Sequence, residues 1–113
     1  MKAYGLKKCS TCQKALEFLA EKKVKVAFTD HSETPPTKEQ VARWSKALGG
    51  WEKMINRAGY TWRGLPKDKT EGLTEVKAVA LAVAHSSLIR RPLIEHADGS
   101  VTVGFSNKVK ELF

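Results

Sequence analysis

The sequence lacks most features of secreted, membrane-spanning and repeat proteins. Its 113 residues include only two cysteines and four prolines, and no apolar run approaches the roughly 18 residues needed to span a membrane. Residues 1–6 have no apolar core like that of a secretory signal. Two cysteines cannot supply a disulfide framework. We therefore expect a soluble, cytoplasmic protein in which the pair serves catalysis, redox sensing or metal binding.

Acidic residues are also scarce. Twelve Asp and Glu face twenty Lys and Arg, so the net charge is +8 and the isoelectric point is about 9.7. A basic protein suits anionic substrates, acidic partners or nucleic acid. However, no run of five or more like charges occurs, so we interpret most lysines as solvated surface. The sequence gives no strong signal for nucleic-acid binding.

The length and composition of the chain indicate one globular domain, residues 1–113. Hydrophobic residues make up 42% and charged residues 28% of the chain, which are ordinary values. A chain of this length buries somewhat under ~70% of its unfolded surface, enough for a self-supporting core.

The first thirty residues predict a strand, a helix and a second strand. Residues 2–6 are a short apolar run in which Gly5 permits close packing. From Ser10 onward the apolar side chains recur at helical spacing, and either Ser10 or Cys9 suits the N-cap. Alternation over residues 24–28 predicts another strand, which completes a βαβ unit with a right-handed crossover. The residues expected on the buried face of the helix are Cys12, Ala15, Leu16 and Leu19.

The middle of the chain predicts helices with no strand between them. Two adjacent prolines forbid continuation of the sheet, and Thr37 with Gln40 resembles a capping box. Thr74 opens a later helix, and irregular turns are expected at Gly59 and over residues 64–66. We interpret residues 33–86 as a helical insertion. The expected apolar faces are Val41, Trp44 and Leu48, then Trp51, Met54 and Ile55, then Val76, Val79, Ala80 and Val83.

The last part of the chain predicts a hairpin and a short helix. Residues 91–95 suit a strand, and Asp98-Gly99 is a favoured pair for a tight hairpin turn. Val101 and Val103 alternate as in a strand, and Ser106 can cap a final helix. The whole order predicts an α/β fold with a thioredoxin-like mixed sheet and a helical insertion.

Both cysteines lie where the first strand gives way to the first helix. Cys9 and Cys12 are three residues apart, and on one helical turn their Cα atoms lie roughly 5–6 Å from each other, which suits a disulfide. The helix N-terminus and neighbouring lysines favour a thiolate at Cys9 and lower its pKa. Cys12 falls on the apolar face and should be more buried and less acidic. We predict that Cys9 attacks and Cys12 resolves the mixed disulfide.

Two alternatives for the cysteines stay open. The pair can be two small buried apolar side chains. Structural zinc is a weaker alternative because it takes four ligands, and the three histidines show no close pair to join the cysteines. The histidines are His31, His85 and His96, and we interpret His85 and His96 as polar surface or edges of the core.

A second informative stretch is Arg90-Arg91-Pro92. A proline at the first residue of a strand costs no ladder hydrogen bond, and a cis bond before it would make a fixed bend. An arginine beside a thiolate would stabilise it and could donate two parallel hydrogen bonds to an oxyanion. On spacing alone, a solvated arginine pair is an equal alternative. Arg57 and Arg63 are weaker candidates. The three tryptophans suit the core of the helices better than a base-stacking platform.

Four segments, in order, resemble the arsenate-reductase (ArsC)/Spx family, which holds arsenate-reductase-related proteins and the Spx transcriptional regulators. The pattern is most similar to the YffB-like branch, and it covers essentially the whole chain. The segments are residues 4–15, 50–63, 88–92 and 103–105.

The resemblance implies a thioredoxin-like fold with a helical insert and a nucleophilic cysteine at Cys9. It also implies an oxyanion-binding arginine before a cis-proline, at Arg91 and Pro92. No bound cofactor or metal is implied, and glutathione or a glutaredoxin is the expected electron source. The residues that we take as candidates for substrate binding are Lys8, Ser10, Thr11, Arg57 and Pro92.

The sequence departs from the arsenate-reductase pattern at two places, and these differences leave two functions to consider. Those enzymes carry a further arginine after the last hairpin, but residues 102–105 contain none. They also have serine where Cys12 stands, and a second cysteine is typical of Spx regulators. The leading hypothesis is a thiol-dependent oxidoreductase with Cys9, Cys12 and Arg91 as catalytic residues. The alternative is a redox-switched regulator that binds RNA polymerase.

Overall fold

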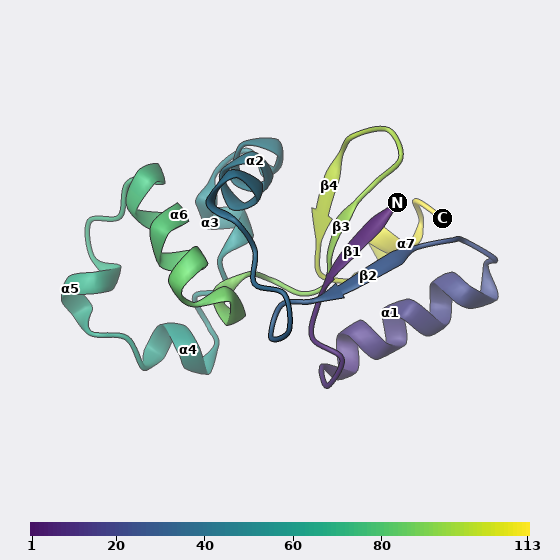
Figure 1. Cartoon of the computed structure of the whole chain (residues 1–113), viewed down its shortest axis with the longest axis horizontal. Helices are drawn as coiled ribbons and strands as arrows, with labels where there is room; N and C mark the ends of the chain where they lie inside the picture. Colours follow the sequence, from purple (N-terminus) through teal and green to yellow (C-terminus); the bar gives the residue numbers. More distant parts are fainter. The chain divides into compact units, whose positions relative to one another are not determined.

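In the computed structural model, which describes all residues 1–113, the chain forms two compact units (Figure 1). The first unit combines Met1–Thr34 with Arg91–Phe113, and the second is Pro35–Arg90. No helix is both long and apolar enough to cross a membrane.

The first unit is built on a four-stranded mixed sheet with the order β2-β1-β3-β4 (Figure 1). The strand β1 is parallel to β2 and antiparallel to β3, and β3 is antiparallel to β4. Gly5 pairs with Asp30 at the carboxyl end of the parallel pair. This sheet confirms the predicted α/β class. The strands are β1 Lys2–Gly5, β2 Ala27–Asp30, β3 Leu93–Glu95 and β4 Val101–Val103.

Two helices, α1 (Ser10–Glu21) and α7 (Asn107–Lys110), complete the first unit. The buried residues of α1 are Cys12, Ala15 and Leu19, three of the four that the helical spacing predicts. Phe105, which follows β4, meets Phe18 of α1 edge to face with 5.4 Å between ring centroids. This contact joins α1 to the C-terminal segment. The buried hydrophobic residues contributed by the sheet are Ala3, Tyr4, Leu93 and Ile94.

The second strand is shifted from its predicted position, because β2 runs Ala27–Asp30 rather than over residues 24–28. The backbone N–H of Val24 donates to the carbonyl of Leu19 (2.9 Å) and so helps to end α1. Lys23 takes a left-handed conformation with φ of 58° at the same point. Residues 22–26 therefore form the connection between α1 and β2, and pairing with β1 starts only after them.

The second unit is helical. Thr37 caps α2 with the predicted capping box: its Oγ1 accepts from the Gln40 N–H (3.1 Å), and the Gln40 side chain accepts from the Thr37 N–H (2.9 Å). Gly49, with φ of 90°, ends the helix. The helix α2 packs on α3 and α6. The elements are α2 Lys38–Leu48, α3 Trp51–Met54, α4 Tyr60–Arg63, α5 Lys67–Thr70, α6 Glu75–Ala84 and the 3₁₀ turn η1 Ser86–Leu88.

The turns of this unit follow the prediction, but one helix face does not. Gly59 and residues 64–66 lie in irregular turns, as expected, and between them Tyr60–Arg63 forms the single-turn helix α4 with glycines as caps. The expected face of α6 is incorrect, since Val76 is 70% exposed while Ala78 and Ala82 are buried. Because α6 is apolar on almost every side, its periodicity does not single out one face.

The C-terminal strands follow the prediction with one shift. The strand β3 begins at Leu93, so Arg91 and Pro92 precede it rather than belong to it. Ser106 is the N-cap residue of α7, although its side chain makes no capping hydrogen bond. Only Val109 of the last helix is buried, and Leu112 is 60% exposed.

Candidate active site

The loop between β1 and α1 carries Cys9 and is fastened by three hydrogen bonds. The N–H of Cys9 donates to the carbonyl of Leu6 (3.1 Å), which closes a turn. The N–H of Lys7 donates to Asp30 Oδ2 (3.0 Å), and Gln13 Nε2 donates to the carbonyl of Lys7 (2.8 Å). The loop is thus tied to the end of β2 and to the first turn of α1, so the position of the Cys9 sulfur is defined by its surroundings.

Cys9 is the N-cap residue of α1 and is partly exposed. Burial of its sulfur is the largest single influence and raises its pKa, but hydrogen bonds outweigh burial and hold the pKa of Cys9 below its ordinary value. The donors are the N–H groups of Cys12 and Thr11, the side chain of Arg91 and the thiol of Cys12. The site therefore favours a thiolate at Cys9.

Cys12 lies one turn along α1 and is only 1% exposed. Burial, with a smaller contribution from the nearby Cys9 sulfur, raises its pKa to about 11, although a hydrogen bond from the N–H of Leu6 opposes the shift. Both cysteines are free thiols in this structure. Their difference in burial and acidity agrees with the expectation from sequence, and their roles in a reaction remain predictions.

Arg91 reaches Cys9 because of the strand order. It lies two residues before the start of β3, which pairs with β1, and β1 runs into the cysteine loop. The Arg91–Pro92 peptide is cis, and Pro92 is buried. The guanidinium is a hydrogen-bond donor to the Cys9 sulfur. The structure thus brings together the three residues that the sequence predicts to be catalytic.

The other candidate residues differ in placement. Lys8, Ser10 and Thr11 flank Cys9 on the exposed side of the loop and first turn. Pro92 is buried. Arg57 belongs to the second unit, where its guanidinium lies over the ring of Trp51 at 5.5 Å. Its role in substrate binding stays a prediction.

Asp30, at the end of β2, was not singled out from the sequence. Its Oδ1 accepts from the N–H (2.8 Å) and Oγ (2.6 Å) of Ser32, and its Oδ2 accepts from the N–H of Lys7. The Ser32 hydroxyl, followed by these two N–H groups, lowers the pKa of Asp30 to about 2. An Asp two residues before a Ser is a known turn signal. The sequence therefore contained a signal for the turn at Asp30 and Ser32, but nothing in that signal indicates that Asp30 contacts the cysteine loop.

His31 is a second buried polar residue near the site. Its ring stacks on Tyr4 with 5.7 Å between centroids, and the Tyr4 hydroxyl donates to Glu95 (2.7 Å). Burial lowers the pKa of His31; the charge of Asp30 opposes this shift and that of Arg91 adds to it. No spacing in the sequence predicts this arrangement.

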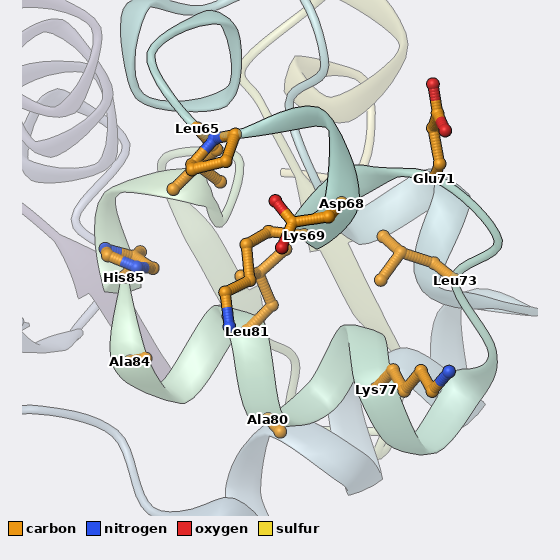
Figure 2. Close-up of a pocket in the computed structure, with 11 residues that line it drawn as sticks. Leu65, Asp68, Lys69, Glu71, Leu73, Lys77, Ala80, Leu81, Ala84 and His85 are labelled. Carbon is orange, nitrogen blue, oxygen red and sulfur yellow. The ribbon is translucent and has the colours of Figure 1, made fainter.

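Each unit contains a cavity. One of about 310 Å³ lies beside the cysteine loop and is lined by Leu6, Lys7, Lys8, Asp30, Ser32 and Glu33. A larger one of about 610 Å³ lies in the second unit, with apolar walls that include Leu73, Ala80 and Leu81 (Figure 2). No group of three or more His, Cys, Asp or Glu side chains is placed to hold a metal ion.

The mixed sheet, with a cysteine pair at the start of its first helix and an arginine before β3, defines a thioredoxin-like protein. Residues 4–112 match the model of the ArsC family, so the chain belongs to that family. This membership confirms the resemblance seen in the sequence.

Several relatives cover almost the whole chain. YusI of Bacillus subtilis is 34% identical over 104 residues, which are 90% of this chain and 87% of that protein. The solved structure of a YffB protein is 36% identical with a TM-score of 0.89 and covers 98% of this chain and 96% of that one. An arsenate reductase (ArsC) related protein from Brucella melitensis is 33% identical with a TM-score of 0.78, covering 99% and 92%. These neighbours support a family of thiol-dependent reductases.

Proposed function

We propose that the protein is a thiol-dependent oxidoreductase that acts on disulfides, with Cys9 as nucleophile and Cys12 as resolving thiol. One observation carries the proposal: a partly exposed Cys9 sulfur accepts hydrogen bonds from Arg91 and from the buried thiol of Cys12. An acidic thiol supplies the nucleophile at neutral pH, and a protonated neighbour can act second.

The reaction consists of two balanced exchanges. The Cys9 thiolate attacks one sulfur of a substrate disulfide, forms a mixed disulfide and releases the other half as a thiolate. Cys12 then gives up its proton to solvent and attacks the Cys9 sulfur, which releases the second half. The substrate gains two electrons and the protein becomes the Cys9–Cys12 disulfide. Two external thiols return it to the reduced state and leave as their own disulfide.

Arg91 and the start of α1 supply the charge stabilisation. The guanidinium and the N–H groups of Thr11 and Cys12 face the sulfur that is negative before attack. The same donors stabilise the Cys9 thiolate again when the external thiols reduce the Cys9–Cys12 disulfide. Lys8 and Ser10 flank the sulfur and are the residues that we assign to substrate contact, with Arg57 as a further candidate.

Glutathione, directly or through a glutaredoxin, is the electron source that we propose, in a reducing compartment such as the cytoplasm. Glutathione carries net negative charge, and the protein carries +8. Attraction of opposite charges raises the rate of encounter. Arsenate is a less favoured substrate, because residues 102–105 lack the arginine expected of arsenate reductases.

The test is turnover of a glutathione mixed disulfide, with arsenate in a parallel assay, by wild type, Cys9→Ser and Cys12→Ser. We expect Cys9→Ser to be inactive. Cys12→Ser should accumulate a mixed disulfide on Cys9, visible as added mass that a reductant removes. Turnover that survives in Cys9→Ser would show that the nucleophile is assigned incorrectly.

The rival proposal is a redox-switched regulator that binds RNA polymerase. A second cysteine at residue 12 favours it, since that is the Spx pattern, and a basic surface suits an acidic partner. Capture of polymerase subunits by the reduced and oxidised protein separates the two proposals. Redox-dependent capture without turnover would support the regulator, and turnover without capture would support the reductase.

A further inference from the structure

Gly5, the last residue of β1, lies directly under the sulfur of Cys12. A Cβ added at residue 5 would stand 2.5 Å from Cys12 Sγ, far inside the ~3.5–4.0 Å at which non-bonded heavy atoms rest. Its other neighbours are not obstructive, because Phe28 and Arg91 would lie 3.6 and 3.8 Å away, at ordinary contact distance. Cys12 alone therefore excludes a side chain at this position.

Backbone conformation does not explain the glycine. Gly5 is absent from the residues with positive φ, which include Gly49 and Gly99. It sits in regular strand pairing, opposite Asp30. Glycine weakens a strand interior, and where it persists it often marks the close approach of another group. Here the approaching group is the Cys12 thiol.

The same stretch of backbone also contacts the sulfur through a hydrogen bond. The N–H of Leu6, the next residue, donates to Cys12, and the Cys12 thiol in turn donates to Cys9. A side chain at residue 5 would push the sulfur away from the N–H of Leu6. Because Cys12 is 1% exposed and packed on all sides, the displaced sulfur would also lose its position against Cys9.

We infer that Gly5 is a positioning residue: by leaving room for the Cys12 sulfur against the β1 backbone, it holds that thiol where it can stabilise and later attack Cys9. The inference rests on the proposed roles of the two cysteines. It adds a residue outside the C-x-x-C segment to the apparatus that sets the reactivity of the pair.

The test is a double-mutant cycle of Gly5→Ala and Cys12→Ala, read out by alkylation of Cys9 against pH and by the lifetime of its glutathione mixed disulfide. With Cys12 present, Gly5→Ala should slow alkylation at neutral pH roughly threefold, the effect of one weak hydrogen bond. It should also lengthen the mixed-disulfide lifetime roughly tenfold, since proximity of the second thiol is lost. In the Cys12→Ala background, where the sulfur is gone, Gly5→Ala should leave the alkylation profile unchanged and should not lower the thermal midpoint, because alanine restricts the unfolded chain.

Each other outcome has a definite meaning. If Gly5→Ala leaves both readouts at wild-type values while wild-type Cys9 is acidic, the inference about Gly5 is overturned and the proposed function stands. If wild-type Cys9 itself behaves as an ordinary thiol, the proposed function fails instead. If Gly5→Ala does not fold, recovery of the fold in Gly5→Ala/Cys12→Ala supports the steric claim, and an equally unfolded double variant contradicts it.

Discussion

At the scale of single residues, a small number of groups determines whether Cys9 is a thiol or a thiolate. Burial acts against the thiolate, and a small set of donors from α1 and from Arg91 outweighs it. Hydrogen bonds to an ionised group are stronger than neutral ones, so the removal of one donor should be measurable. The residues around the sulfur therefore offer the sharpest tests.

Arg91→Ala should make Cys9 less acidic. Without the guanidinium, the thiolate loses a charge-assisted hydrogen bond, so its pKa rises and alkylation at neutral pH slows about tenfold. At strongly alkaline pH the rates of variant and wild type should converge, because both are then thiolates. Arg90→Ala is the matched control, since Arg90 is exposed and its backbone N–H bond to the Met54 carbonyl is retained. Equal profiles for both variants would show that Arg91 does not act on Cys9.

Asp30→Asn should change how stability depends on acid. The folded pKa of Asp30 is about 2, below its ordinary 3.8. Its contribution is therefore fully present above pH ~4 and is lost as the pH falls toward ~2. Wild type should exceed Asp30→Asn in thermal midpoint at neutral pH, and the gap should close across that window. Ser32→Ala should show a smaller change of the same sign, and a gap that is constant with pH would contradict the assignment.

At the scale of elements, the site is where a strand end, a helix start and a neighbouring strand start coincide. The parallel pairing of β1 with β2 brings Asp30 to the cysteine loop, and the antiparallel pairing with β3 brings Arg91 there. In the second unit, the starts of α2 and α6 are capped by the hydroxyl side chains of Thr37 and Thr74. Local signals thus decide where elements begin, and strand pairing decides which residues meet.

Thr37→Ala should destabilise the fold by about 1 kcal/mol, the usual cost of losing a helix cap. The threonine Oγ1 satisfies the N–H of Gln40 at the start of α2, and alanine leaves that N–H to solvent. Chemical denaturation monitored by circular dichroism measures the difference. Thr34→Ala, at an exposed position shortly before the helix, is the control and should cost much less. A cost for Thr37→Ala no larger than the control's would mean that the capping box contributes little.

The sequence was sufficient for the elements that carry local signals. The C-x-x-C segment, the capping box of Thr37 and the Asp98-Gly99 turn were all predictable because neighbouring residues specify them. The face of α6 was not, since its residues are apolar nearly all round. The role of Asp30 was hidden because its partner, Lys7, is 23 residues away and is reached only through strand pairing. The close approach of the Cys12 sulfur to Gly5 likewise could not be predicted from the sequence, because it depends on how α1 packs on β1.

At the scale of the whole molecule, charge and family membership set the expectations. The chain carries +8, and its relatives in the ArsC family cover nearly its full length. Two compact units divide the chain, and the proposed chemistry rests on the first of them. The net charge should therefore influence which substrates the cysteine pair meets most often.

The reaction of reduced protein with glutathione disulfide should slow as salt is added. An increase from about 0.02 M to about 0.5 M NaCl shortens the screening length several-fold and should reduce the rate roughly threefold. Hydroxyethyl disulfide, which is uncharged, is the control and should show little change. The measurement is stopped-flow loss of free thiol. A salt effect that is the same for both disulfides would show that the net charge does not steer the substrate.

The acidity of Cys9 is the central claim, and its alkylation rate as a function of pH, followed by mass spectrometry of the modified peptide, tests it most directly. We predict a midpoint below the ordinary thiol value of 9.0, with Cys12 unmodified over the same range because it is buried. A Cys9 midpoint at or above that value, or faster modification of Cys12 than of Cys9, would contradict the account.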